Sequence, residues 1–400
     1  MKQKNSTAIS HRPFVSVILP SYNHANFVTA AIESVLGQSF HNIELIVVDD
    51  GSTDGTPEMV AAITDKRVKL VRLEQNRLRQ TRNLAIKMAE GNYIAFQNSD
   101  DEWLQDKLQA QIDVLEKRRD VSVCFTGVEL IDENNQIVTN SWANGLFTTK
   151  NRSNISWLRL FFEQGNCLCI TSAVIRRDKL DSIGLFNGSL IQVSDFDLWI
   201  RLAATGQFHI VEEKLTRMRI VGVQKSQLGT DRNLELLHWA AAPMMRQFRR
   251  AAGLVLPVSI KSRVKTFFDD KNIHVESTDQ NLSAPKASTT NRAAFEFAEV
   301  LENFSKYPIQ DLLPLIFADV MPTSINTVST RKAWLIKYAW TKKSPAHHLF
   351  ANVLMAAMLA NDTVRGEITS EFGAEIVKEY INRRGELSLR FQLMDKKHGI

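Results

Sequence analysis

Residues 15–56 read VSVILPSYNHANFVTAAIESVLGQSFHNIELIVVDDGSTDGT, and this stretch decides the fold class. It opens with the apolar, β-branched run Val15–Leu19, and a second such run follows at Ile43–Val48. Between the two runs, apolar residues recur at helical spacing over Phe27–Gln38. The runs predict buried strands, and the spacing between them predicts an amphipathic helix. The stretch is therefore typical of a strand–helix–strand unit.

The same alternation continues along the chain up to residue 96. The next expected elements are a helix at Thr56–Ile63, a strand at Val68–Leu73, a helix at Arg79–Gly91 and a strand at Tyr93–Phe96. Strands that alternate with helices favour βαβ units, and these build a mostly parallel sheet with helices on both faces. Ligands of such sheets bind beyond the carboxyl ends of the strands. We therefore expect an α/β domain with its site at that edge.

Polar clusters follow three of these strands at the point where each strand ends. Pro20–Asn23 follows the first strand, Asp49–Thr56 the second and Gln97–Asp101 the fourth. Each cluster taken alone could be only a turn, a loop shaped by glycine, or the cap of the next helix, expected at about Trp103–Arg118. Because the carboxyl ends of parallel strands meet at one edge of a sheet, the three clusters together predict a site there.

Three blocks of the sequence resemble the family 2 inverting glycosyltransferases, which have the GT-A fold and use nucleotide-sugar donors. The blocks are the stretch at residues 15–56, TRNLAIKMAEGNYIAFQNSDDEW at residues 81–103 and SDFDLWIRLAATG at residues 194–206. They occur in the family's order and at plausible spacing, and the resemblance covers residues 13–225. It implies a Rossmann-like GT-A domain with a mostly parallel central sheet, which is the fold class that the alternation also predicts.

The resemblance assigns roles to individual residues. It implies that Pro20 and Tyr22 line the pocket for the nucleotide base and that Asp50 accepts a hydrogen bond from the base. Uracil offers the required N–H group, and thymine presents the same edge. The resemblance also implies that Asp100 and Asp101 are the acidic pair that grips the ribose and a divalent cation. That cation, Mg²⁺ or Mn²⁺, would offset the charge of the donor diphosphate.

Two further roles follow from the same resemblance. It favours Arg82 over Arg79 as the residue that adds positive charge near the phosphates. Asp195 matches the carboxylate proposed as catalytic base, which would take the proton from the acceptor hydroxyl as it attacks. Attack from the face opposite the leaving group inverts the anomeric centre. Without the resemblance, Ser194 or Asp195 would read as the cap of the helix that follows.

Some positions depart from the family's pattern. Asn98 stands where the family often has Asp, Ser194 stands where an acid is common, and the segment Asn76–Arg82 lacks a usual glycine. Asn98 brings no charge, so a cation would depend on Asp100, Asp101 and the diphosphate itself. These departures favour one alternative, a GT-A binding or scaffold protein whose transferase site has decayed. A sugar nucleotidyltransferase is a weaker alternative, because PSYNHANF replaces its glycine-rich N-terminal loop.

The rest of the chain is predicted to be helical. We expect a GT-A domain at residues 1–240 and a helical accessory domain at residues 241–400, with a polar loop or linker near residues 276–291. The expected helices are Trp239–Leu256, Arg292–Lys306, Ile309–Phe317, Arg331–Trp340, Ala346–Leu359 and Glu367–Arg384.

Composition narrows the class of protein and its location. The three cysteines form no disulfide framework and no Cys/His metal motif, and the net charge of +5 comes from scattered basic residues. The first residues lack the apolar core of a signal peptide, and the apolar stretch Leu349–Ala360 is too short to span a bilayer. We expect a cytoplasmic protein without a nucleic-acid partner. Peripheral contact of the C-terminal region with the inner face of the membrane is an alternative to ordinary helix packing.

The resemblance also implies an activity. The expected reaction is inverting transfer of a sugar from a UDP- or dTDP-sugar to a glycan or lipid-linked acceptor. Surface polysaccharide synthesis is the usual setting of the family.

Overall fold

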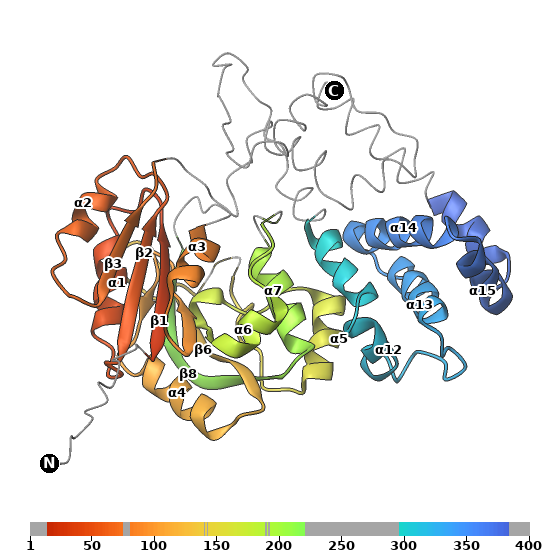
Figure 1. The fold of residues 1–400 in the computed structure, drawn as a ribbon, viewed down its shortest axis with the longest axis horizontal. Helices are drawn as coiled ribbons and strands as arrows, with labels where there is room; N and C mark the ends of the chain where they lie inside the picture. Colours follow the sequence, from red (N-terminus) through yellow and green to blue (C-terminus); the bar gives the residue numbers. More distant parts are fainter. Residues whose placement is uncertain are drawn as a thin grey trace, which may run out of the picture. The chain divides into compact units, whose positions relative to one another are not determined.

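The computed structural model describes residues 14–74, 81–139, 141, 143–188, 190, 193–220 and 296–383. Contacts divide the chain into two units (Figure 1). The first unit comprises Met1–Asn154, Asn166–Phe186 and Thr205–Gly222, and the second comprises Ile155–Gly165, Asn187–Ala204 and Val223–Ile400. The expected domain boundary at residue 240, the linker near residues 276–291 and the helix at residues 239–256 lie outside the described residues.

The first unit is built on one eight-stranded sheet, in the order β3-β2-β1-β4-β7-β6-β8-β5. The strands are β1 Val15–Ser21, β2 Ile43–Asp49, β3 Val68–Arg72, β4 Tyr93–Phe96, β5 Glu102–Trp103, β6 Val121–Ile131, β7 Val174–Arg176 and β8 Gln207–Arg219. β1 pairs in parallel with β2 and β4, β2 with β3, and β6 with β8. β5 and β7 pair antiparallel with their neighbours. The predicted mostly parallel sheet is therefore confirmed, and so are its first four strands.

Helices pack against this sheet. They are α1 Val28–Leu36, α2 Thr56–Ala61, α3 Thr81–Met88, α4 Lys107–Lys117 and α6 Arg177–Ile183, and η1 Ile170–Ser172 is a 3₁₀ turn. Alternate residues of β1 (Val15, Val17 and Leu19) are fully buried in one apolar cluster with residues of α1 and α4. Successive side chains of a strand point to opposite faces, so this alternation packs one face of the sheet against helices. All three cysteines are free thiols.

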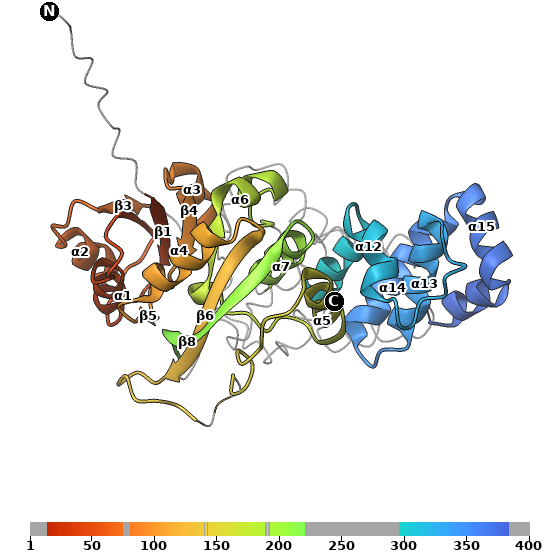
Figure 2. The same ribbon diagram turned by 90° about the horizontal axis from the view of Figure 1, so that it is seen from below.

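One predicted helix begins later than expected. The sequence predicts a helix from about Trp103, but Glu102 and Trp103 form the short strand β5, which pairs with β8, and α4 begins at Lys107 after the N-cap Asp106. Ser99 and Asp100 therefore do not cap this helix, and the capping interpretation of QNSDDEW is wrong. β6 and β8 run side by side as long strands (Figure 2), and β8 offers the edge that β5 occupies.

The second unit is helical in all its described parts apart from connecting turns. Its elements are α5 Asn154–Gln164, α7 Ser194–Ala203, η2 Glu302–Ser305, α12 Ile309–Ile316, α13 Val328–Trp340, α14 Pro345–Leu359 and α15 Asp362–Phe372, and residues 296–301 and 375–383 are also helical. The predicted helical C-terminal region is confirmed. The single helix expected at residues 367–384 is two helices, because the chain turns at Gly373 with φ of 73°.

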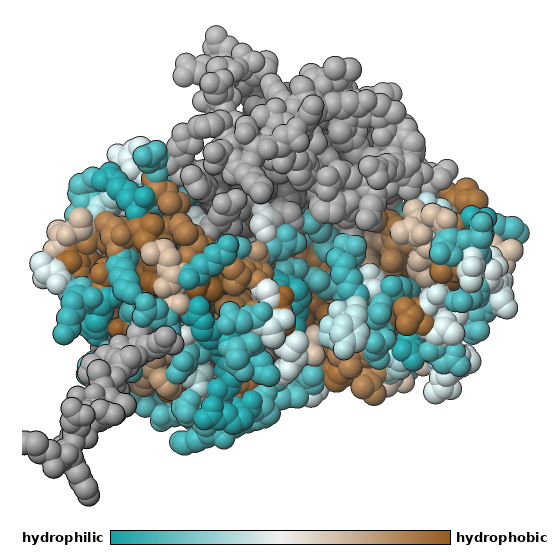
Figure 3. All heavy atoms as spheres, viewed as in Figure 1, coloured by the Kyte–Doolittle hydropathy of each residue, from teal (hydrophilic) through white to brown (hydrophobic). Residues whose placement is uncertain are grey.

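An aromatic core holds this second unit together. The ring of Phe162, on α5, lies 5.0 Å from the ring of Phe304 and 5.3 Å from that of Phe317, both edge-on. On the outside, hydrophilic and apolar residues are interspersed over α13 to α15 (Figure 3). Among the described residues, no helix has the length and apolarity needed to cross a bilayer.

Candidate active site

The loops that follow β1 and β2 are joined by reciprocal hydrogen bonds. The backbone N–H of Asn23 donates to Ser52 Oγ (2.9 Å), and the backbone N–H of Thr53 donates to Asn23 Oδ1 (2.9 Å). Asn23 has a φ of 51°, in the left-handed region that asparagine adopts more readily than most residues. The sequence PSYNH thus has its asparagine where the backbone needs one, and the first two polar clusters meet as predicted.

His24 connects these two loops to the loop that follows β4. Its ring Nδ1 is hydrogen-bonded to Ser99 Oγ at 2.7 Å, and its backbone N–H donates to Thr56 Oγ1 at 3.0 Å. Ser99 belongs to the segment QNSDDEW at residues 97–103. All three polar clusters therefore lie together at the carboxyl edge of β1, β2 and β4, which confirms the predicted convergence.

Asp49 and Asp50 have different surroundings at this edge. Asp49 is fully buried, and its two carboxylate oxygens accept hydrogen bonds from the backbone N–H (3.0 Å) and the hydroxyl of Ser52. Asp50 is anchored through its backbone N–H, which donates to the carbonyl of Ser21 (2.8 Å). Asp49 therefore shapes the loop, and Asp50, which is also buried, lies at the point where this loop meets the end of β1. Pro20 and Tyr22, on either side of Ser21, are half-buried.

Three buried polar atoms at this edge have no hydrogen-bond partner in the described part of the chain. They are Ser21 Oγ at the end of β1, Thr81 Oγ1 at the start of α3 and Gln97 Oε1 just beyond β4. Buried polar groups are nearly always hydrogen-bonded, so a group of exceptions calls for an explanation. A polar ligand seated at this edge of the sheet would satisfy them.

Asp101 is held on all sides by protein donors. Its Oδ2 accepts from the hydroxyl of Thr171 (2.6 Å) and from Asn98 Nδ2 (2.9 Å), and its Oδ1 accepts from the backbone N–H of Arg219 (2.9 Å). Only 2% of its surface is exposed. This burial, with the charge of the neighbouring Asp100, raises the pKa of Asp101 to about 7. A carboxylate with three protein donors fits poorly as a metal ligand.

Asp100 fits that role better. It is half-buried and precedes Asp101 in the same loop. No group of three or more His, Cys, Asp or Glu side chains within the described ranges is placed to hold a metal ion. A single carboxylate completed by phosphate and water oxygens is nevertheless a usual ligand set for Mg²⁺. The residues present therefore suit a cation that is bound jointly by Asp100 and a diphosphate.

Arg82, which the resemblance assigns to the phosphates, lies beside this loop. Its Nη2 is 3.4 Å from Asn98 Oδ1, and its guanidinium lies 5.7 Å from the ring centroid of Phe186. Asn83 fixes Phe186 through reciprocal hydrogen bonds to its backbone, of 2.9 Å and 3.0 Å. Arg82 thus brings a positive charge next to QNSDDEW from the first turn of α3. Arg79 lies outside the described residues.

We expect the variant Asn98→Asp to be less stable than the wild type. The amide of Asn98 donates to the buried carboxylate of Asp101, and a carboxylate at position 98 has no hydrogen to donate. The substitution would also bring a second negative charge next to Asp101. The free energy of unfolding, measured with urea, should fall by about 1–3 kcal/mol at neutral pH. An unchanged or higher stability would contradict this account of Asn98.

Two residues that bind the same loop were not predicted. Thr171 comes from η1 and Arg219 from the end of β8, and they are 70 and 118 residues from Asp101 in the sequence. Neither residue belongs to a recognisable sequence motif. Only the pairing of β8 with β5 and β6 brings Arg219 here, and the sequence did not predict that pairing.

Asp195 belongs to the second unit, in the first turn of α7. It is half-buried, and its Oδ1 accepts from the backbone N–H of Phe196 (2.9 Å). Val193 is the N-cap of α7, and no side chain makes a capping bond there, so the interpretation of Ser194 or Asp195 as the cap is wrong.

Asp197, two residues further along α7, is buried and tied down. Its Oδ2 accepts from Arg201 Nε (2.9 Å) and Nη2 (2.7 Å), and its Oδ1 accepts from Asn303 Nδ2 (2.9 Å). This carboxylate therefore stabilises the helical unit, in the way that Asp101 stabilises its loop.

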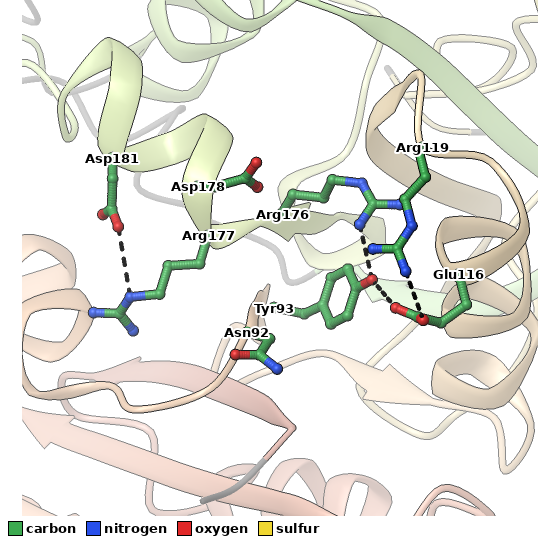
Figure 4. A pocket seen from close by; sticks show the side chains of 8 residues that line it. All are labelled: Asn92, Tyr93, Glu116, Arg119, Arg176, Arg177, Asp178 and Asp181. Carbon is green, nitrogen blue, oxygen red and sulfur yellow. Dashed lines mark hydrogen bonds and ion pairs between the residues drawn. The ribbon is translucent and has the colours of Figure 1, made fainter.

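A hollow of about 390 Å³ lies where β4 begins at Tyr93, at the opposite end of the strand from QNSDDEW. Its lining residues are Asn92, Tyr93, Glu116, Arg119, Arg176, Arg177, Asp178 and Asp181 (Figure 4). Three arginines face three acids, and ion pairs join Arg177 to Asp181 (3.7 Å) and Arg119 to Glu116 (3.5 Å). The formal charges of these six side chains balance, so the hollow has no excess charge that would attract a charged ligand.

Comparison with known proteins identifies the family. The family model described as glycosyl transferase family 2 matches residues 16–184. WfgD of Escherichia coli, named as a UDP-Glc:alpha-D-GlcNAc-diphosphoundecaprenol beta-1,3-glucosyltransferase, is 35% identical over 190 residues, which are 47% of this chain and 69% of that protein. The chain belongs to glycosyl transferase family 2. Membership and the observed sheet together confirm the predicted fold class, a GT-A domain followed by a helical region.

Other relatives are matched over smaller shares of their own length. TuaG of Bacillus subtilis, a putative teichuronic acid biosynthesis glycosyltransferase, is 42% identical over 123 residues, 30% of this chain and 48% of that protein. The chain spans 37% of the length of an uncharacterized glycosyltransferase of Rickettsia felis, at 31% identity over 56% of this chain. Among solved structures, S. aureus TarS 1-349 in complex with UDP-GlcNAc has a TM-score of 0.48 and 16% identity, over 87% of this chain and 92% of that one.

Proposed function

We propose that this family 2 member is an inverting glycosyltransferase that moves a sugar from a UDP- or dTDP-sugar to a glycan or lipid-linked acceptor, in surface polysaccharide synthesis. The observation that carries the proposal is the joined edge of β1, β2 and β4, where hydrogen bonds connect the loops that contain Asp50 and Asp100 and place Arg82 beside the second of these loops. Three buried polar atoms at this edge have no partner within the described residues. The printed names of relatives support it, since WfgD and WfaP of Escherichia coli are named for a UDP-Glc donor and a diphosphoundecaprenol-linked acceptor.

The chain's own residues would bind the donor in two parts. Asp50 would accept the imide N–H of the base, with Pro20 and Tyr22 beside it. Arg82 would lie against the diphosphate and offset part of its charge. Asp100 would hold a divalent cation against the same phosphates, and such a cation, when bound, stabilises the negative charge that develops on the leaving diphosphate.

Asp195 would act as the general base. Its carboxylate would take the proton of the acceptor hydroxyl while the acceptor oxygen forms a bond to the anomeric carbon. The bond from that carbon to the diphosphate breaks on the opposite face, so the nucleoside diphosphate leaves and the configuration inverts. The position of Asp195 in the first turn of α7 suits this role, because the helix dipole favours a charged carboxylate there.

A lipid-linked acceptor would bring the chain to a membrane surface. Exposed apolar side chains support contact of the second unit with lipid. Among them are Tyr307 (80% exposed), two residues before α12 begins at Ile309, and Leu315 (60% exposed), within α12. The cytoplasmic location with peripheral contact at the inner face is part of this proposal.

Titration of the wild-type chain with UDP, with and without Mn²⁺, tests the proposal. We expect binding that the cation tightens by at least about tenfold, or 1.4 kcal/mol. A panel of UDP- and dTDP-sugars, followed by release of the nucleoside diphosphate, then identifies the donor. Nucleotide binding without release from any donor would favour the scaffold alternative, and synthesis of a nucleotide sugar from a nucleoside triphosphate would favour the nucleotidyltransferase. Absence of any nucleotide binding would contradict the proposal outright.

A further inference from the structure

We infer that Arg219 is a positioning residue, which fixes the loop at residues 98–102 so that the side chain of Asp100 faces the donor diphosphate. This inference rests on the proposed function and deepens it. Arg219 is the last residue of β8, and only 2% of its surface is exposed. A buried arginine must pair its donors, so its partners show which part of the chain it holds.

The partners of Arg219 lie on three consecutive residues of the loop. Its Nε donates to the carbonyl of Asp100 (2.8 Å), its backbone N–H donates to Asp101 Oδ1 (2.9 Å), and its Nη2 donates to Glu102 Oε1 (2.6 Å). The contact with Glu102 is an ion pair in which the arginine side chain is buried. One residue thus holds the backbone of Asp100, the side chain of its neighbour and the start of β5.

The remaining contacts of Arg219 anchor the guanidinium on the other side. Its Nη1 donates to the carbonyl of Asp132 (2.6 Å), just beyond β6, and its guanidinium carbon lies 4.9 Å from the ring centroid of Phe27. Phe27 is the N-cap of α1, next to the loop that follows β1. The guanidinium is therefore fixed by the sheet and by the neighbouring loop at once, and it can impose one geometry on residues 100–102.

This arrangement requires arginine. The guanidinium is planar and directs its N–H groups along fixed, diverging directions, whereas a lysine ammonium is a single point. Lysine at position 219 would keep the positive charge near Glu102 but could not also reach the carbonyls of Asp100 and Asp132. Arg219→Lys therefore removes the geometry and leaves the charge. Residues that orient a metal ligand in this way typically affect metal affinity by about 10–100-fold when replaced.

Arg176 provides a matched control. It is also buried (6% exposed) and makes four hydrogen bonds, including those to the carbonyl of Val121 (2.8 Å) and the hydroxyl of Tyr93 (2.9 Å). It lies on β7 at the opposite end of β4 from QNSDDEW (Figure 4). Arg176→Gln should therefore lower thermal stability without changing the loop of Asp100.

The experiment measures UDP affinity by calorimetry in Mn²⁺ and in EDTA for the wild type, Arg219→Lys, Arg219→Gln, Glu102→Gln and Arg176→Gln, together with the melting temperature of each. The quantity to compare is the ratio of UDP affinity in Mn²⁺ to UDP affinity in EDTA. We expect this ratio to be about 10–100-fold lower in both Arg219 variants than in the wild type, while their affinity in EDTA stays within about twofold of the wild-type value. Glu102→Gln should lose part of the gain, and Arg176→Gln should keep all of it despite a lower melting temperature.

Two results would overturn the inference. The first is a full Mn²⁺ gain in folded Arg219→Lys, and the second is an equal loss in Arg176→Gln, which would tie the gain to overall stability. If Arg219→Gln does not fold, Arg219→Lys and Glu102→Gln decide the question through their ratio of UDP affinity in Mn²⁺ to UDP affinity in EDTA. A wild type that binds UDP equally in Mn²⁺ and EDTA also refutes the role of Arg219. A wild type that binds no nucleotide at all refutes instead the proposed function, so the two failures are distinct.

Discussion

Replacing Asp195 by asparagine is expected to slow sugar transfer by about 10²–10⁴-fold and to leave the affinity for UDP unchanged. The amide has the size of the carboxylate, and its oxygen can keep the hydrogen bond from the backbone N–H of Phe196. It cannot take a proton from the acceptor at neutral pH. Turnover measured as UDP release, beside calorimetric binding of UDP, separates the chemical step from donor binding.

Asp197→Asn is the control for this experiment, because it makes the same chemical change two residues away. Asp197 accepts from Arg201 and Asn303, so the variant should lose about 1–3 kcal/mol of folding free energy and keep its turnover per folded molecule. Full activity in Asp195→Asn would show that another group is the base. Loss of UDP binding in that variant would show that Asp195 serves the donor instead.

The sequence was sufficient for the part of the fold that local patterns determine. β1, β2 and β4 contain apolar runs followed by polar residues, and each run becomes a strand of the central sheet because both faces of a parallel sheet are buried. The position of the site followed from the same patterns, since His24 and Asn23 join loops that the topology alone brings to one edge.

Longer-range pairing could not be predicted in this way. The sequence predicts that Trp103 begins a helix, but it belongs to a strand, because Thr216 of β8 pairs with it and the backbone carbonyl of Thr171 accepts from its indole N–H (3.0 Å). The partners of Asp101 come from 70 and 118 residues away for the same reason. Pairing with a strand from a distant part of the chain overrides the local secondary-structure propensity of a segment.

The division of roles between Asp100 and Asp101 was also beyond the sequence, whereas the resemblance already distinguished Asp195 from Asp197. Asp100 and Asp101 are chemically identical, and so are Asp195 and Asp197. In each pair one carboxylate is buried with protein donors on both oxygens, and its neighbour is half-buried. Burial and the donors on both carboxylate oxygens identify Asp101 and Asp197 as acids that support the structure.

This difference predicts opposite effects at Asp100 and Asp101. Asp100→Asn should lower the melting temperature less than Asp101→Asn does, because Asp100 is only half-buried. It should lose most of the gain in UDP affinity that Mn²⁺ provides, because an amide oxygen is a weaker ligand than a carboxylate for a hard cation. Asp101→Asn should melt at a lower temperature, since asparagine leaves a donor facing the donors of Thr171, Asn98 or Arg219. Equal melting temperatures for the two variants would contradict the reassignment.

The pH dependence of stability gives a second test that does not involve a cation. Because the folded-state pKa of Asp101, about 7, lies above its ordinary value of 3.8, the folded protein binds a proton there that the unfolded chain releases. The stability contributed by this group is therefore full below pH 3.8 and is lost as the pH rises through about 7. Urea unfolding at several pH values should show this loss in the wild type, a smaller loss in Asp100→Asn, because the charge of Asp100 helps to raise the pKa of Asp101, and no such loss in Asp101→Asn. Identical pH profiles in all three proteins would mean that Asp101 stays charged in the fold, and the donors of Thr171, Asn98 and Arg219 would then outweigh its burial.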